Sequence, residues 1–167
     1  FCVVPFTRGL ESSRPIDNIF EESRKLVDQG VKEITLLGQN VDSYLWYGGG
    51  LKKDFDKATD MQKATSVNFA GLLELVAQAQ PKMRIRFSTS NPQDMTLDVI
   101  EAMAKYRNIC KYIHLPVQSG SNRILKAMNR LHTREEYFEL IDNIKKLIPD
   151  CAISQDMITG FPTETEE

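Results

Sequence analysis

The three cysteines are the first candidates for chemistry, because a thiolate can bind a metal or act as a nucleophile. Cys2, Cys110 and Cys151 lie far apart and form no C-x2-C pair. This spacing argues against a self-contained zinc site, and their odd number argues against the disulfide framework of a small secreted protein. A lone cysteine is most often a small buried residue, which is the first interpretation of each. We therefore expect a protein of the reducing cytoplasm.

The two histidines suggest neither a metal site nor a hydrolytic triad. His114 lies inside an apolar segment, and no second ligand stands at metal-binding spacing from it. Neither histidine has a serine or cysteine partner close in sequence. We interpret His114 as a hydrogen-bonded strand residue and His132 as an exposed residue before a helix.

Four arginines are further candidates for a functional role. Arg8 and Arg14 follow Cys2 closely, whereas Arg84 and Arg86 alternate along one short apolar segment. Strand side chains repeat every second residue, so the second pair must share a face. Solvated or salt-bridged arginines are an equally good interpretation.

Helices and strands alternate along the chain and must position these residues. The periodicity and the capping residues predict helices over 15–30, 68–80, 96–106, 122–128 and 134–148, and strands over 33–37, 84–87, 111–117 and 152–158. A capping box at 133–136 begins the last helix, and Thr96 is expected to cap the third. Residues 41–66 contain three consecutive glycines and no sustained period, which predicts a long mobile loop.

Each of the four predicted strands ends in a polar cluster: GQN at 38–40, STSN at 88–91, QSGS at 118–121 and TG at 159–160. The order of elements predicts an α/β fold of parallel βαβ units. An open sheet and a barrel both remain consistent with this order, but a barrel brings every carboxyl-terminal strand end to one site. Four polar ends out of four favour the barrel, although such residues also serve as ordinary turns. The glycine and proline of 160–162 could likewise hold backbone amides near a ligand or simply form a turn.

Composition excludes several classes of protein. The 167 residues are 41% hydrophobic and 26% charged, as in an ordinary globular domain large enough to form a core without disulfides. The formal charge of −2 is not that of an autonomous nucleic-acid-binding domain. No apolar run approaches the roughly 18 residues that a membrane span needs. The chain begins at Phe1 without methionine, which we interpret as a sign of a fragment.

Seven strings carry a resemblance that covers nearly the whole chain: FCVVPFTRG, SRP, TLLGQN, RIRFSTSNP, HLPVQSGS, LKAMNR and GFPTETEE. In this order they resemble the radical S-adenosylmethionine (SAM) methylthiotransferases, and most closely the MiaB-type enzymes that modify transfer RNA. Related enzymes that methylthiolate an aspartate of a ribosomal protein share the SRP and GFP segments. They look less like LLGQN and HLPVQSGS, so the tRNA branch is favoured.

The resemblance implies an iron–sulfur cluster and SAM as cofactors. The cluster motif of the family is C-x3-C-x2-C with an aromatic residue before the third cysteine, and Phe1 and Cys2 match that last pair. Cys2 is then the third thiolate of a [4Fe–4S] cluster whose open iron SAM occupies, and Phe1 lies near the adenine. A second cluster belongs to the full-length enzyme.

The resemblance also assigns residues to SAM, by segment rather than by atom. The end of the first strand receives the amino group, the next two strand ends line the methionine and ribose, and the last flanks the adenine. Arg14 is a candidate for supporting the ligand or the cluster loop. The residues are Gly38, Gln39 and Asn40, then Ser88, Thr89, Ser90, Gln118 and Ser119, and finally Ile158 and Gly160.

The implied fold is part of a (β/α)6 barrel of TIM type, incomplete at both ends, with residues 1–167 as the radical SAM core. The family adds a strand and the cluster loop before Phe1, a strand after Glu167, an N-terminal domain and a C-terminal β-domain that holds RNA. The implied reaction inserts a methylthio group at C2 of N6-isopentenyladenosine beside the anticodon, and it needs an electron donor. We expect the fragment alone to be inactive, no more than a SAM-binding scaffold, and to associate through open strand edges.

Overall fold

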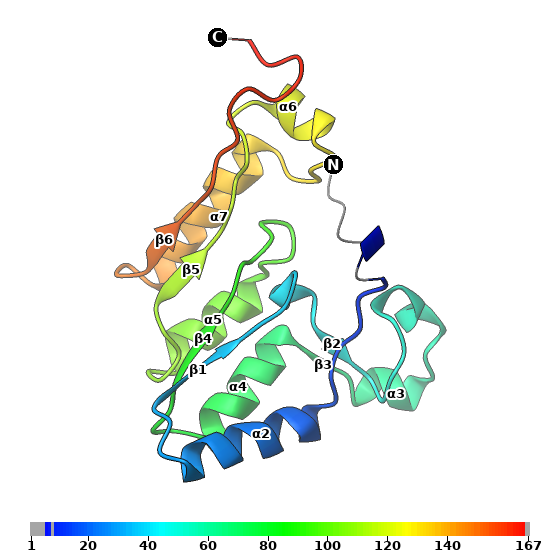
Figure 1. Ribbon diagram of the computed structural model, residues 1–167, viewed down its shortest axis with the longest axis vertical. Helices are drawn as coiled ribbons and strands as arrows, with labels where there is room; N and C mark the ends of the chain where they lie inside the picture. Colours follow the sequence, from blue (N-terminus) through cyan, green and yellow to red (C-terminus); the bar gives the residue numbers. More distant parts are fainter. Residues whose placement is uncertain (1–5, 8, 166–167) are drawn as a thin grey trace.

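The computed structural model describes residues 6–7 and 9–165, and helices and strands alternate along this part of the chain (Figure 1). In chain order the elements are α2 (Ile16–Asp28), β1 (Glu33–Leu36), η1 (Val41–Ser43), β2 (Leu45–Trp46), η2 (Lys52–Lys57), α3 (Asp60–Ala64), β3 (Val67–Asn68), α4 (Phe69–Ala79), β4 (Arg84–Phe87), α5 (Leu97–Lys105), β5 (Tyr112–His114), α6 (Asn122–Ala127), α7 (Arg134–Leu147) and β6 (Ala152–Ser154).

The four strands that follow the predicted βαβ order are parallel. Strand β1 pairs with β4, and β5 pairs with β6. A parallel bridge between Ile85 and Ile109 connects the two pairs, and the Ser90 amide donates to the His114 carbonyl at 3.0 Å. The predicted α/β class with parallel strands is therefore confirmed, in the order β1, β4, β5, β6.

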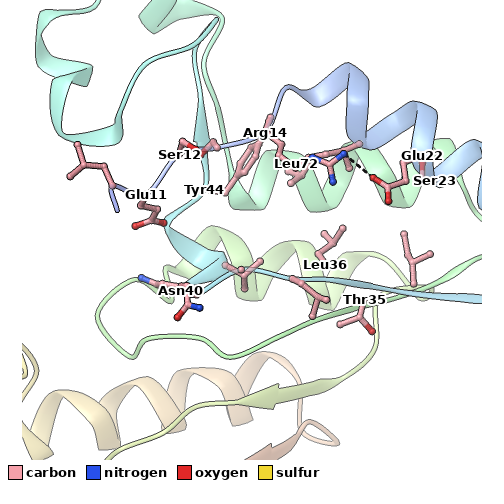
Figure 2. Close-up of a pocket in the computed structure, with 18 of the residues that line it drawn as sticks. Glu11, Ser12, Arg14, Glu22, Ser23, Thr35, Leu36, Asn40, Tyr44 and Leu72 are labelled. Carbon is pink, nitrogen blue, oxygen red and sulfur yellow. Dashed lines mark hydrogen bonds and ion pairs between the residues drawn. The ribbon is translucent and has the colours of Figure 1, made fainter. Parts of the chain in front are cut away.

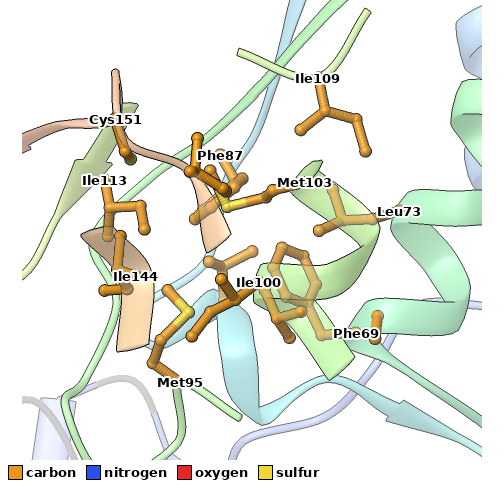
Figure 3. Packing of buried hydrophobic residues seen from close by; sticks show 14 of the residues in the cluster. Phe69, Leu73, Phe87, Met95, Ile100, Met103, Ile109, Ile113, Ile144 and Cys151 are labelled. Atoms are coloured by element: carbon orange, nitrogen blue, oxygen red, sulfur yellow. The ribbon is translucent and has the colours of Figure 1, made fainter. Parts of the chain in front are cut away.

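The helices follow the strands in the same order. Helix α2 contacts α4, α4 contacts α5, and α5 contacts α7, so a row of helices accompanies the row of strands (Figure 1). Alternate strand residues such as Ile85, Phe87 and Ile113 point into the core that this row covers, where each is at most 5% exposed. Figure 3 shows Ile113 and Phe87 packed with Met103 and Leu73 from α5 and α4. Burial of this one side of the strands leaves their other side to polar residues.

The segment 41–66 differs from its prediction as a long loop without structure. It contains the antiparallel β2–β3 pair, the turn η2 and the helix α3, which begins with a capping box between Thr59 and Gln62. The Tyr47 ring packs edge-on against Phe55, with ring centroids 5.2 Å apart. These elements are too short to produce a hydrophobic period, so the sequence pattern did not indicate them.

Of the two predicted helix N-caps, the one at α7 is confirmed and the one at α5 is not. The Thr133 hydroxyl accepts from the Glu136 amide at 3.2 Å, and Glu136 accepts from the Thr133 amide at 2.7 Å, which confirms the capping box of α7. Thr96 occupies the N-cap position of α5, but its hydroxyl donates to the Asp98 carboxylate and caps no backbone amide. The Val99 amide, which the Thr96 hydroxyl was expected to cap, donates to the Asp98 carboxylate at 3.0 Å instead.

Replacing Thr133 by alanine is expected to lower the free energy of unfolding by about 1 kcal/mol, because the Glu136 amide loses its acceptor. The measurement is the urea midpoint of the variant. Thr133→Ser keeps the hydroxyl and is the matched control, with a midpoint close to that of the wild type. Equal midpoints for the alanine and serine variants would contradict this role.

His132 was expected to be exposed, but it is only 6% exposed. Its ring lies beside the Tyr137 ring, with centroids 6.2 Å apart, because the first turn of α7 folds over it. Burial lowers the pKa of this histidine. Of the helices in the described ranges, none is long and apolar enough to cross a membrane.

Candidate functional site

A large pocket is lined by the segment before α2, by α2 itself, by strand β1 and by the turn that follows β1 (Figure 2). It has a volume of about 670 Å³, in the size range of small-molecule sites. Glu11 and Asn40 lie at one end in Figure 2, and Glu22 and Ser23 at the other. The lining residues are Gly9 to Arg14, Ile19, Glu22, Ser23, Leu26, Ile34 to Val41, Tyr44 and Leu72. A pocket with apolar walls and polar groups at its ends is suited to a ligand that has both apolar and polar parts.

The polar cluster that ends β1 lines this pocket. Gly38, Gln39 and Asn40 are all among the lining residues. The Gly38 amide donates to the Ser88 hydroxyl at 3.3 Å, and that hydroxyl is 3.3 Å from the Gly38 carbonyl oxygen. Parallel pairing of β1 with β4 thus brings the first two predicted strand ends together.

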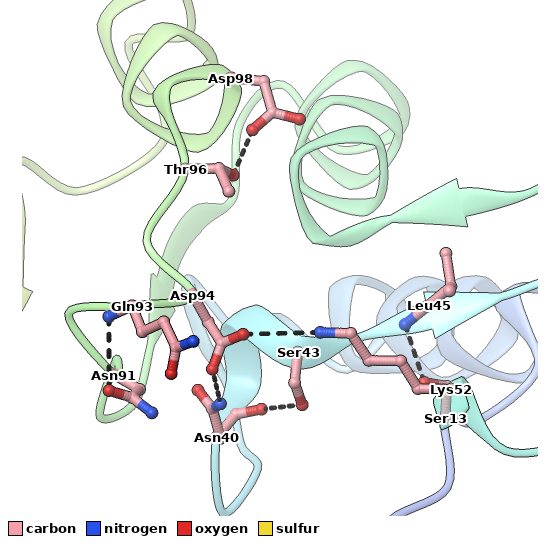
Figure 4. A network of polar contacts seen from close by, with 10 residues as sticks. All are labelled: Ser13, Asn40, Ser43, Leu45, Lys52, Asn91, Gln93, Asp94, Thr96 and Asp98. Carbon is pink, nitrogen blue, oxygen red and sulfur yellow. Dashed lines mark hydrogen bonds and ion pairs between the residues drawn. The ribbon is translucent and has the colours of Figure 1, made fainter. Parts of the chain in front are cut away.

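The side-chain nitrogen of Asn40 has a hydrogen-bond partner, whereas its side-chain oxygen has none among the described residues. Its Nδ2 donates to Asp94 Oδ2 at 2.5 Å, and Asp94 Oδ1 lies 3.6 Å from the Lys52 ammonium (Figure 4). Its Oδ1 is buried and has no hydrogen-bond partner among the residues that the structure describes. A buried acceptor without a donor is costly, so this oxygen is suited to an N–H group of a ligand.

The end of β4 is fixed by a buried carboxyl group. Asp42 is 7% exposed and Ser90 is 1% exposed, and the Ser90 hydroxyl donates to Asp42 Oδ1 at 3.1 Å. Burial raises the pKa of Asp42 to about 7, the Ser90 hydrogen bond opposes this, and the charge of Asp94 adds to it. Ser90 therefore holds η1 against the end of β4, and it does not line the pocket.

Acidic groups gather at the Asn40 end of the pocket. Burial raises the pKa of Glu11, the Lys52 charge counteracts this, and the Asp94 charge reinforces it. Glu11 lines this end of the pocket, and Asp94 lies 3.6 Å from the Lys52 ammonium. The surroundings of Asn40 thus favour a ligand group that donates hydrogen bonds and carries positive charge.

Arg14 lines the pocket, but its guanidinium is paired. Nη2 donates to Glu22 Oε2 of α2 at 2.8 Å, and the side chain is 62% exposed. The Tyr44 hydroxyl donates to the Arg14 carbonyl at 2.9 Å and joins this segment to the chain after β1. Arg14 is therefore in place to border a ligand, while its charge is directed toward α2.

The ends of β5 and β6 are joined to each other, away from this pocket. The Gln118 amide donates to the Asp156 carbonyl at 3.0 Å, and the Ile158 amide donates to the Gln118 carbonyl at 2.8 Å. Gln118 adopts a positive φ of 73°, and the buried Ser119 hydroxyl accepts from the Ser121 amide at 3.2 Å. Gln118, Ser119 and Ile158 do not line the large pocket, and neither does the exposed Thr89.

The sequence left two interpretations open for the turn at Gly160, a ligand contact and an ordinary turn. The Gly160 and Phe161 amides donate to Glu164 Oε2 at 2.6 and 3.0 Å, as in an ordinary turn. Gly160 also lies outside the lining of the large pocket. A carboxylate four residues further on closes the turn, so this segment is stabilised by its own side chain.

Arg84 and Arg86 share a face of β4, as predicted, and both are bound by one carboxylate. Glu33 of β1 lies 3.3 Å from the Arg84 guanidinium and 2.8 Å from that of Arg86. Hydrogen bonding from Arg86 lowers the pKa of Glu33. Of the two interpretations that the sequence left open, the salt bridge is the one that the structure shows.

Phe1, Cys2 and Arg8 lie outside the described residues. The other two cysteines are free, and burial raises the pKa of both the Cys110 and the Cys151 thiol. His114 binds the Ser154 hydroxyl through Nδ1 at 2.8 Å, as expected for a hydrogen-bonded strand residue. Within residues 6–7 and 9–165, no three side chains of His, Cys, Asp or Glu are grouped so that they could hold a metal ion.

The sequence analysis did not single out Asp42, Lys52 or Asp94. Lys52 comes from the segment that was predicted to be an unstructured loop, and Asp94 follows β4 by seven positions. Each acts through a partner about 40 to 50 residues away in sequence. The parallel pairing of β1 with β4 brings the loops after these two strands together, and only this pairing could have indicated the three residues.

Comparison with known proteins yields a family and close relatives. The model of the family described as the radical SAM superfamily matches residues 1–167. A protein of Christiangramia forsetii named tRNA-2-methylthio-N(6)-dimethylallyladenosine synthase is 80% identical over 167 residues, which are 100% of this chain and 35% of that protein. Proteins with the same name from Flavobacterium johnsoniae and Karelsulcia muelleri are 71% and 61% identical, over 100% and 99% of this chain and 35% and 36% of theirs. The chain thus spans about a third of the length of the curated relatives it matches.

Proposed function

Because the chain belongs to the radical SAM superfamily, we propose that it is the SAM-binding core of an enzyme that inserts a methylthio group at C2 of N6-isopentenyladenosine in tRNA. The observation that carries this proposal is the 80% identity over the whole chain to a protein named tRNA-2-methylthio-N(6)-dimethylallyladenosine synthase. In this proposal residues 1–167 are one partial domain of a longer, cytoplasmic protein.

The pocket beside β1 fits SAM in its chemistry. SAM carries an amino group and a sulfonium centre, and the Asn40 end of the pocket offers an unused acceptor among carboxyl groups. Gly38, Gln39 and Asn40 would hold the amino group, with Arg14 at the border of the site.

The remaining assignments extend this site beyond the large pocket. We propose that Ser88, Thr89, Gln118 and Ser119 border the methionine and ribose, and that Ile158 and Gly160 border the adenine. Ser90 joins this set through the buried contact with Asp42, which fixes the loop. These assignments require the ends of β5 and β6 to close toward β1, as they would in the (β/α)6 barrel of the family.

Cys2 would ligate a [4Fe–4S] cluster, with Phe1 near the adenine. When bound, the cluster would supply an electron and SAM the radical chemistry that removes the hydrogen from C2 of the base. The residues of this chain contribute binding and orientation, and an enclosed pocket keeps water away from such chemistry. No general base is needed for a hydrogen abstraction, which is consistent with the paired state of Glu33 and His114.

Binding of the anticodon arm would depend largely on basic surface outside this chain. The formal charge of the chain is −2, and Arg14, Arg84 and Arg86 are already paired with Glu22 and Glu33. An isolated chain would also expose the outer edges of β1 and β6, where each strand has one partner among the described strands. Open edges favour association, so we expect the isolated chain to form oligomers and to lack activity.

The experiment offers two substrates to the full-length protein that carries this chain, after anaerobic reconstitution with iron, sulfide, SAM and a reductant. We expect a tRNA that contains N6-isopentenyladenosine to gain the mass of a methylthio group in place of hydrogen. A ribosomal protein with an exposed aspartate is the control substrate and is expected to keep its mass. A gain on the ribosomal protein alone would replace this proposal by the related one, and no gain on either would reject both.

A further inference from the structure

We propose that Asp94, held in place by Lys52, is a positioning residue that turns the Asn40 amide so that its oxygen faces the amino group of SAM. The inference rests on the proposed function, because it takes SAM as the ligand. It adds two residues, one after β4 and one from the segment between β1 and α4, that neither the sequence nor the relatives assign.

The argument begins with the two faces of a primary amide. Asn40 can present either its NH2 group or its oxygen to a ligand, and a half-turn about the last side-chain bond exchanges the two. A carboxylate only accepts hydrogen bonds, so Asp94 selects the orientation in which Nδ2 faces it, at 2.5 Å. The oxygen is then left without a partner among the described residues, as the structure shows.

Asp94 is itself held from two sides. Its amide donates to the Asn91 carbonyl at 2.9 Å, which fixes the turn after β4. Its second carboxylate oxygen lies 3.6 Å from the Lys52 ammonium, and its side chain is only 27% exposed (Figure 4). Lys52 begins η2, so this ion pair connects η2 to the turn after β4.

The charges around the Asn40 side-chain amide indicate which chemical group of a ligand can bind there. Asp94 lies 3.6 Å from the Lys52 ammonium, Glu11 lines the same end of the pocket (Figure 2), and the Asn40 oxygen can only accept a hydrogen bond. An ammonium group donates three hydrogen bonds and carries the opposite charge, whereas a carboxylate would be repelled here. The amino group is therefore the part of SAM that this end of the pocket selects.

The test compares the binding of two ligands to the reconstituted full-length protein without reductant, so that SAM stays intact. Asp94→Asn is expected to weaken SAM binding roughly tenfold, because the new amide can donate to Asn40 Oδ1 and release the fixed orientation. Binding of 5′-methylthioadenosine, which lacks the amino-acid part of SAM, is expected to be unchanged. Lys52→Met is expected to weaken SAM binding by a smaller factor in the same ligand-selective way.

Asp98→Asn is the matched control. Asp98 also accepts from an asparagine, Asn68 Nδ2 at 2.7 Å, but neither residue lines the large pocket. We expect it to bind both ligands like the wild type. Equal SAM affinity in Asp94→Asn and the wild type would overturn the inference, and so would equal losses for the two ligands. Failure of the wild-type protein to bind SAM would instead reject the proposed function itself.

Discussion

Replacing Cys2 by alanine in the full-length protein is expected to abolish the reductive cleavage of SAM. Loss of one of three thiolate ligands removes the cluster or its ability to pass an electron to SAM. We expect the formation of 5′-deoxyadenosine to fall roughly a hundredfold or more, since even the loss of an outer partner of a metal ligand costs 10- to 100-fold. The measurement is the amount of 5′-deoxyadenosine formed after anaerobic reconstitution, together with the iron content.

Cys110→Ala is the matched control for this loss. The Cys110 thiol is free, and burial raises its pKa, so it is held as a neutral thiol and is a poor metal ligand. This variant should keep the cluster and the cleavage of SAM. Retained cleavage in Cys2→Ala, or a loss of equal size in Cys110→Ala, would contradict the assignment of Cys2.

Replacing Asp42 by asparagine is expected to stabilise the protein at alkaline pH and to have a much smaller effect in acid. Burial raises the pKa of this carboxyl from 3.8 to about 7 in the folded state. At acid pH the Asp42 carboxyl is protonated in both the folded and the unfolded state, so its ionisation does not lower the stability. As the pH rises between these two values, the unfolded chain loses the proton while the folded chain keeps it, so stability falls. Above pH 7 the loss is complete, at no more than about 4 kcal/mol.

The readout is the urea midpoint of Asp42→Asn and of the wild type across this pH range. The advantage of the variant is expected to grow by about 2 kcal/mol between about pH 5.5 and pH 8. The amide keeps an acceptor for the Ser90 hydroxyl, so packing around η1 is preserved. Asp142→Asn, at an exposed position of α7, is the control. A constant difference at all pH values would show that Asp42 does not titrate in this way.

The elements with a clear period or a clear cap could be predicted from the sequence. Strand β4 has the predicted bounds, β1 is one residue shorter, and α7 begins at the predicted capping box. These features depend on neighbours within four residues, which a sequence shows directly. Strands β5 and β6 are shorter than predicted, because the chain beyond them leaves regular pairing.

Contacts between distant segments could not be predicted in the same way. His132 is buried because α7 folds over it, and Lys52 reaches Asp94 because the segment after β1 forms short elements of its own. Neither has a local signal, since the partners lie in other parts of the fold. Thr96 shows that a local signal can also fail, because the nearby Asp98 carboxylate accepts from the amide that Thr96 was expected to cap.

The candidate site was predicted in part. The sequence singled out Gly38 to Asn40 because a polar cluster ends a strand, and these residues line the large pocket. Reading every strand end as an open ligand contact was less successful, since Ser90 is buried against Asp42 and Gly160 is bound by Glu164. Polar residues after strands serve loop structure as well as ligands.

A crystal structure of the reconstituted full-length protein with SAM tests the central claim most directly. We expect SAM in the pocket beside β1, with its amino group in hydrogen-bond reach of Asn40 Oδ1 and a [4Fe–4S] cluster bound through Cys2. SAM bound elsewhere, with this pocket empty and the Asn40 oxygen still without a donor, would contradict the account.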